Sequence, residues 1–286
     1  MKKLKITRIN KVLNNKDNKI FYNFAVNDNE NYFANNILTH NCYVARFNRD
    51  KVFINENMES ITNSISKWVE KKPFPKVPNQ VDDTYYCIDI GCSTDVALHY
   101  KFYDWRYVFD FFNRHPKLKS TFATKYPTKF RYDILPVNKE KHRIRISLMP
   151  QKISNLLEPN TDKIIDRINM IPILQEKMEV HINFSPIVYY DTWLEDYKEL
   201  FEVLKSKNID VKCECIFLTY NENQAVLQKD LLIKSILYNP NLQESKNSEY
   251  AADNLRYKWY LKEQMITQFK QLYTQYFSHS NIRYIF

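Results

Sequence analysis

The sequence predicts an α/β fold whose parallel sheet is open or rolled into a partial barrel, preceded by a small all-β unit. Strand-like and helix-like segments alternate from residue 42 onwards, which is the order that parallel sheets require. Residues 1–41 instead carry two alternating strand-like segments, Lys5–Val12 and Ile20–Val26, around an asparagine-rich turn. With 44% hydrophobic and 15% aromatic residues, the chain can bury a sizeable core.

Each later element is predicted from its local pattern. Short apolar runs between turn residues are typical of strands, and wider apolar spacing is typical of helices. The predicted strands are Tyr85–Ile90, Thr121–Thr124, Arg143–Ser147, Glu179–Phe184, Val211–Leu218 and Ile282–Phe286. The predicted helices are Trp105–Phe112, Lys163–Glu176, Trp193–Leu204, Gln224–Leu237 and Tyr260–Phe277. Because the polar stretch Asn239–Asn247 reads as a linker, we expect three units, at residues 1–41, 42–238 and 239–286.

Charge and cysteine content narrow the class of protein. The net charge of +9 suits a polyanion such as nucleic acid, although many basic proteins bind none. Cysteines at positions 42, 87, 92, 213 and 215 form no even disulfide pattern, and we expect a reducing, cytoplasmic location. No apolar run is long enough to span a bilayer, so no membrane is expected. Gly91 is the only glycine, and asparagine is therefore expected at turns with positive φ.

Residues 31–42 read NYFANNILTHNC, a pattern with a specific chemistry. The Asn41 side chain can attack its own peptide carbonyl, while His40 polarises that carbonyl or supplies a proton. Cys42 can take over an upstream acyl group as a thiolate. The pattern resembles the C-terminal end of an intein, which implies a split intein that splices in trans with a separate N-terminal polypeptide. A plain hairpin with a chance His-Asn-Cys is the alternative.

Polar residues also follow the predicted strands of the larger unit. Cys92, Lys125, Ser147 and Ser185 each lie at or just after the end of a strand. Each residue alone would more often be a packing or surface residue. The carboxyl ends of parallel strands form one rim where ligands bind, so the four side chains are expected to face a common pocket.

Segments in the same order resemble the spore photoproduct lyase family of radical S-adenosylmethionine enzymes. Cys42-Tyr43 is similar to the end of the C-x3-C-x2-C motif that binds a [4Fe–4S] cluster. The other similar segments are Gly91–Asp95, Ala123–Tyr126, Arg145–Leu148, Leu157–Thr161 with Arg167, Ser185–Ile187 with Trp193 and Tyr197, and Leu255–Trp259. The resemblance implies a partial (β/α) barrel of the radical S-adenosylmethionine type.

The resemblance also implies two cofactors, a [4Fe–4S] cluster and S-adenosylmethionine. Cys42 is the one cluster ligand of the motif in this chain, and the other two are expected on the N-terminal partner. Lys125 is implied to meet the carboxylate of S-adenosylmethionine, with Ser147 and Thr94 as further cofactor-binding residues. Cys42 would then serve first in splicing and later in cluster binding, so the isolated chain is expected to lack lyase activity.

The implied reaction is the reversal of a thymine dimer in DNA by a 5′-deoxyadenosyl radical. Cys92 is implied to return a hydrogen atom to the product radical, and Tyr43 is the candidate relay that regenerates the cofactor. Arg256, Tyr257 and Lys258 are the implied substrate-binding residues. A radical enzyme with another substrate, or a non-catalytic DNA-associated protein that keeps the fold, are the alternatives.

The remaining cysteines are interpreted as packing residues. Cys87 lies inside a predicted strand, and Cys213 and Cys215 would face the same side of another. A C-x-C pair can bind a metal, but no second pair matches it.

Overall fold

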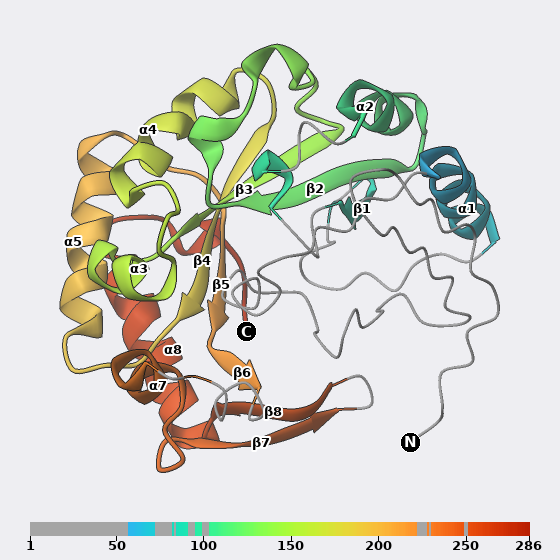
Figure 1. Ribbon diagram of the computed structural model, residues 1–286. Coiled ribbons are helices and arrows are strands. Elements are labelled where there is room, and N and C mark those ends of the chain that lie inside the picture. The colour runs from blue at the N-terminus through green and yellow to red at the C-terminus, as the bar shows by residue number, and fades with distance from the viewer. Residues whose placement is uncertain are drawn as a thin grey trace, which may run out of the picture.

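A six-stranded parallel sheet is the centre of the computed structural model, which describes residues 57–71, 82, 84–90, 95–98, 103–221, 228, 230–248 and 251–286. The strand order is β1-β2-β3-β4-β5-β9, and every neighbouring pair is parallel. The strands are β1 (Tyr86–Asp89), β2 (Leu118–Thr124), β3 (His142–Leu148), β4 (Glu179–Ile187), β5 (Cys213–Phe217) and β9 (Ile282–Ile285). The sheet curls into a half-barrel (Figure 1), which confirms the predicted α/β class.

Helices connect the strands and lie along one face of the sheet (Figure 1). The helices are α1 (Met58–Lys71), α2 (Trp105–Arg114), α3 (Gln151–Leu157), α4 (Ile164–Gln175), α5 (Trp193–Ser206), α7 (Leu231–Leu237) and α8 (Trp259–Tyr273). Short 3₁₀ turns lie at Val96–Leu98, Pro127–Lys129, Tyr132–Ile134 and His279–Asn281. None of the described helices is both long and apolar enough to cross a membrane.

The core between the sheet and these helices is strongly aromatic. Phe184 of β4 contacts Phe201 of α5 and Phe269 of α8 edge to face, with ring centroids 5.6 and 5.8 Å apart. Such pairs add about 0.5–1.5 kcal/mol each beyond the area that they bury. Cys213 and Cys215 are fully buried on β5, as predicted for packing residues. This packing fixes α5 and α8 against the central strands.

The opposite face of the sheet is charged, because successive side chains of a strand point to opposite faces. Arg145 of β3 pairs with Asp89 of β1 and with Glu214 of β5. Arg283 of β9 donates to the other oxygen of Glu214. Burial alone would raise the pKa of Glu214, but its contacts with His181 and the two guanidinium groups lower that pKa below its usual value. The described charges on this face are therefore paired across strands.

A second, antiparallel sheet lies beyond the carboxyl end of β5 (Figure 1). Its order is β6 (Thr219–Asn221), β8 (Ala251–Tyr257) and β7 (Gln243–Ser248). The prediction of a linker at Asn239–Asn247 is therefore wrong for the second half of that segment, because β7 pairs with β8 there. Its polar residues mislead because a short, partly exposed strand needs few apolar side chains. The division at residue 238 stays a prediction.

Candidate functional site

Two of the predicted rim residues lie on neighbouring strands. Ala123 and Thr124 of β2 pair in register with Arg145 and Ile146 of β3, so Lys125 and Ser147 follow side by side. Both side chains are buried. The strand ends therefore bring a cation and a hydroxyl together. The expected position of Ser185 at the end of its strand is wrong, because β4 continues to Ile187, and Cys92 lies outside the described residues.

Lys125 is held from three directions. Its ammonium group forms an ion pair with Glu158, and only about 5% of either residue is exposed. Its backbone N–H donates to Asp95 Oδ2 at 2.7 Å. Its carbonyl oxygen accepts from the Asp162 N–H at 3.2 Å. This restraint keeps a positive charge at the carboxyl end of β2.

The fully buried Arg167 organises the loop that carries Glu158. Its Nη2 donates to Glu158 Oε2 at 3.0 Å, and its Nη1 donates to the carbonyl of Ser147 at 2.8 Å. Its Nε donates to the carbonyl of Asp162 at 2.8 Å. One guanidinium group thereby ties α4, the loop and β3 together.

Asn160 makes the tight turn in that loop. Its φ is 70°, in the left-handed region that ordinarily favours glycine. Asparagine tolerates this region better than other non-glycine residues. The structure thus confirms, at Asn160 and again at Asn208 with φ 55°, the expectation that asparagine serves at such turns in a glycine-poor chain.

Asp95 anchors the chain directly after Thr94. Its Oδ1 accepts from Thr124 Oγ1 at 2.8 Å and from the Ala97 N–H at 3.0 Å, while its Oδ2 accepts from Lys125. Burial raises the pKa of Asp95, and these donors act against that rise. Sequence reasoning missed this role, although an aspartate directly after the predicted site residue Thr94 was a usable signal.

Asn183 is a second residue that sequence reasoning missed. It lies on β4, in register with Ser147 of β3 and Glu214 of β5. Its Oδ1 is buried and has no hydrogen-bond partner among the described residues. A polar residue inside the predicted strand Glu179–Phe184 was the available signal.

The predicted substrate-binding residues lie on the second sheet and at its exit. Arg256 of β8 pairs with Glu244 of β7 through Nε and Oε1, 3.0 Å apart. Lys258 is partly exposed just before α8. Tyr257 is buried, and its hydroxyl accepts a hydrogen bond from the Tyr189 N–H at 2.8 Å. Tyr257 is therefore a packing residue in this structure, whereas its two neighbours are accessible.

The other predicted site residues lie outside the described part of the chain. They are His40, Asn41, Cys42, Tyr43, Cys92 and Thr94. Within the described ranges, no three His, Cys, Asp or Glu side chains are grouped to bind a metal ion. The structure thus describes the cation, hydroxyl and amide side of the candidate site.

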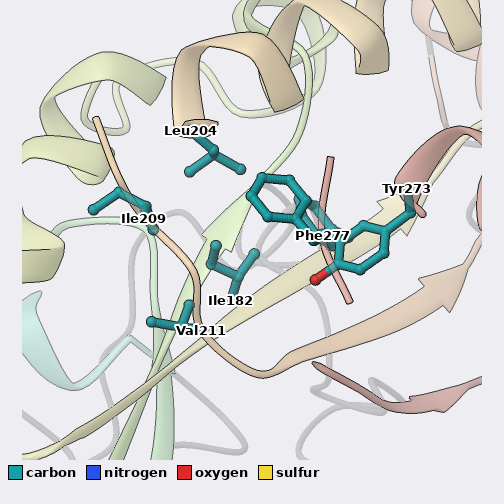
Figure 2. Close-up of a pocket in the computed structure, with 7 residues that line it drawn as sticks. Ile182, Leu204, Ile209, Val211, Tyr273 and Phe277 are labelled. Atoms are coloured by element: carbon teal, nitrogen blue, oxygen red, sulfur yellow. The ribbon is translucent and has the colours of Figure 1, made fainter. Parts of the chain in front are cut away.

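A small cavity lies elsewhere, on the helix-covered face of the sheet (Figure 2). It encloses about 10 Å³ and is lined by Ile182, Phe184, Leu204, Ile209, Val211, Tyr273 and Phe277. Its lining is almost wholly apolar, and its volume is near the lower limit for one water molecule. The cavity is therefore a packing defect of the core and unsuited to a substrate.

Comparison with known proteins identifies a family for the chain. A family model described as spore photoproduct lyase matches residues 8–286. The matched range includes residues 8–41, which lie in the segment interpreted above as an intein end. A search of the curated proteins gave no match.

Solved structures of spore photoproduct lyase share the fold. A mutant with bound AdoMet and dinucleoside spore photoproduct aligns with a TM-score of 0.69 and 14% identity, covering 86% of this chain and 72% of that chain. A mutant with dinucleoside spore photoproduct aligns with a TM-score of 0.71 and 15% identity, covering 87% and 73%. At this low sequence identity, the likeness shows that this chain shares the half-barrel fold of those structures.

Proposed function

The chain belongs to the spore photoproduct lyase family, and we propose that it forms part of a radical S-adenosylmethionine lyase that reverses a thymine dimer in DNA. The observation that carries the proposal is the restrained Lys125 cation at the carboxyl end of β2. It is joined through Asp95 to the segment that directly follows Cys92 and Thr94. Asp95 lies three residues after Cys92, the candidate hydrogen donor, which supports a site that combines the two side chains.

The side chains at the rim fit the S-adenosylmethionine that the family implies. A buried cation suits the amino-acid carboxylate of this cofactor, and hydroxyl groups suit its polar atoms. Lys125 would bind the carboxylate, and Ser147 and Thr94 would bind neighbouring polar groups. When bound beside a [4Fe–4S] cluster, this cofactor supplies a 5′-deoxyadenosyl radical that removes a hydrogen atom from the lesion.

Cys92 would complete the repair of the lesion. Its S–H bond breaks, a C–H bond forms on the product radical, and a thiyl radical remains. Tyr43 would then transfer its phenolic hydrogen atom to that sulfur, which restores the thiol and leaves a tyrosyl radical for the return of the hydrogen of 5′-deoxyadenosine. A thiol suits this step because its S–H bond is weak enough to release a hydrogen atom, which an Asp or Ser side chain would not do.

Cys42 would bind the cluster together with two cysteines of a partner polypeptide. Residues 1–41 would act as the C-terminal part of a split intein, in which Asn41 cyclises with help from His40 and Cys42 receives the partner's acyl group. The family match over residues 8–41 gives this segment a competing assignment. Co-expression with a partner that carries the N-terminal intein half decides between them by mass spectrometry.

Splicing predicts a product that contains residues 42–286 joined to the partner and lacks residues 1–41. Asn41→Ala should prevent release of the intein segment, which makes it the matched control. A chain that keeps residues 1–41 after co-expression would overturn the splicing proposal and leave the lyase proposal standing.

DNA is the proposed partner of the lyase. Arg256 and Lys258 are partly exposed, and the net charge of +9 favours a polyanion. The lesion would have to leave the base stack to reach the rim. The charge and the accessible basic side chains support phosphate contacts on the second sheet.

The decisive test uses the ligated protein with an anaerobically reconstituted cluster and a dinucleoside spore photoproduct. We expect thymine products from the wild type and aberrant products from Cys92→Ala, because the product radical then lacks its hydrogen donor. Cys87→Ser, which alters a buried thiol in β1, should leave the products unchanged. Identical products from Cys92→Ala and the wild type would remove Cys92 from the mechanism.

The isolated chain provides a second test. Since it carries one of the three motif cysteines, iron and sulfide should give no stable [4Fe–4S] cluster and no lyase activity. A normal cluster spectrum from the isolated chain would contradict the division of ligands between two polypeptides.

A further inference from the structure

Three buried polar atoms on the charged face of the sheet have no hydrogen-bond partner among the described residues. They are Thr121 Oγ1 on β2, Arg145 Nε on β3 and Asn183 Oδ1 on β4. Their residues are 0%, 4% and 6% exposed. Native proteins satisfy most buried polar groups, so an unpaired one requires an explanation such as a water or a ligand.

The three atoms lie at different depths along the strands. Thr121 is in register with Arg143 of β3, three residues before the end of β2 and four residues along the chain before Lys125. Asn183 is in register with Ser147, next to the end of β3. Of the three, Asn183 is therefore the one that shares a level with the predicted cofactor residues.

The neighbouring carboxylate cannot serve as a partner for Asn183. Glu214 lies beside Asn183 on β5, but its oxygens accept hydrogen bonds from Arg145, Arg283 and Tyr284. An amide oxygen is an acceptor, so it requires a donor, which a carboxylate in these contacts does not provide. Among the described residues no donor reaches this oxygen, so a hydroxyl or amine of a bound ligand can serve as its partner.

We propose that Asn183 is a further cofactor-binding residue, whose amide oxygen accepts a hydrogen bond from the nucleoside half of S-adenosylmethionine. This inference rests on the proposed function, because it assumes that Lys125 meets the cofactor carboxylate. Lys125 follows β2 and Asn183 belongs to β4. Because β3 lies between them, these residues are separated by two strand spacings, or about 10 Å. If Lys125 bound the cofactor carboxylate, the hydroxyls and amine of the nucleoside half would be the donors left for Asn183.

The proposal predicts opposite effects on affinity and stability. Asn183→Ala removes an unpaired buried acceptor, so the free chain should unfold at the same or a higher denaturant concentration than the wild type. The same variant should bind S-adenosylmethionine about tenfold more weakly, since one ligand hydrogen bond is lost. If Asn183 had a purely structural role, its replacement would lower the stability of the chain instead.

Thr121→Val is the matched control, because it removes an unpaired buried hydroxyl below the rim with little change in shape. It should also keep or raise stability, and its affinity for S-adenosylmethionine should equal that of the wild type. Weakened binding by Thr121→Val to the same extent as by Asn183→Ala would overturn the assignment to the rim.

The experiment measures binding of S-adenosylmethionine, 5′-deoxyadenosine and methionine to the full chain by ligand-observed NMR, together with guanidinium unfolding. We expect Asn183→Ala to weaken binding of the first two ligands and to leave methionine binding unchanged. Wild-type affinity of Asn183→Ala for 5′-deoxyadenosine, or a clear loss of stability, would overturn the inference.

Lys125→Ala separates this inference from the proposed function. If Lys125→Ala weakens binding of S-adenosylmethionine and methionine while Asn183→Ala changes nothing, the inference alone fails. If both variants bind S-adenosylmethionine like the wild type, the cofactor does not bind at this rim and the proposed function fails.

Discussion

The backbone N–H of Lys125 donates a hydrogen bond to Asp95 Oδ2 over 2.7 Å. The same carboxylate accepts from Thr124 and Ala97 through its other oxygen. One buried side chain thus joins the end of β2 to the residues that directly follow Cys92 and Thr94. The position of Lys125 therefore depends on a carboxylate that the family resemblance alone did not mark as important.

Asp95→Asn should lower the free energy of unfolding by about 2 kcal/mol, the range for hydrogen bonds to a charged group. An asparagine keeps the shape but turns one acceptor oxygen into a donor that faces other donors. Guanidinium unfolding of the isolated chain measures the effect. Asp110→Asn, on the exposed side of α2, should stay within about 0.5 kcal/mol of the wild type. Equal unfolding midpoints for Asp95→Asn and the wild type would contradict the anchoring role.

His142 should make stability depend on pH. Burial and the nearby Lys119 and Lys141 charges lower the pKa of His142 to about 3. Its Nε2 donates to Asn113 Oδ1 at 3.0 Å, so its Nδ1 accepts from the Ser120 hydroxyl at 2.8 Å. The folded state therefore keeps the ring neutral, because a second proton would place a positive charge in a buried site beside Lys119 and Lys141.

The sign follows from proton binding. Between pH 6.5 and 3 the unfolded chain binds a proton at this ring and the folded chain does not, so stability falls as the pH falls. Going from pH 7.5 to 5.5 should cost the wild type about 1 kcal/mol more than His142→Gln. His279→Gln, at an exposed site, should keep the wild-type slope. Parallel slopes for His142→Gln and the wild type in urea unfolding would refute a neutral buried ring.

Arg167→Lys should be strongly destabilising. A lysine cannot replace the contacts of the guanidinium group with Glu158, Ser147 and Asp162, and it leaves the buried Glu158 poorly paired. We expect a loss of about 3–5 kcal/mol in the free energy of unfolding. Arg131→Lys is the control, because its pair with Asp133 is more than half exposed and should matter by less than about 1 kcal/mol.

Arg256→Ala and Lys258→Ala should weaken binding to undamaged duplex DNA and make it less dependent on salt. Each lost phosphate contact should reduce the slope of log affinity against log salt by about 1. Fluorescence anisotropy between 50 and 200 mM salt, as a rough working range, measures that slope. Lys198→Ala, on the exposed face of α5, should leave it unchanged. A wild-type slope for both variants would exclude them from the DNA-binding surface.

The sequence predicted the central sheet because apolar residues occupy the face that packs on the helices. The polar face of the sheet explains why one strand was predicted too short. The predicted strand Thr121–Thr124 begins at Leu118 in the structure, and the prediction missed its start because Lys119 is buried in ion pairs with Asp82 and Glu179. Hydropathy alone reads such a lysine as surface, so strand ends with paired charges are missed.

Prediction of the candidate site was limited in a different way. Lys125 and Ser147 could be found because they follow recognisable strands. Glu158 lies in one of the segments that resemble the family, but its pairing with Lys125 arises only when the loop after α3 folds back over the end of β2. Asn183 could not be assigned, because its unpaired oxygen appears only once every neighbouring strand is in place.

Strand β9 follows every other described strand in the chain, yet it completes the sheet beside β5. A nascent chain on the ribosome that ends before residue 282 therefore leaves the edge of β5 open and Glu214 without Arg283. An unpaired strand edge invites association with other chains, and an uncompensated carboxylate resists burial. The six-stranded sheet can thus be completed only after residue 285 has been translated, and chains that stop earlier should associate more readily with other chains.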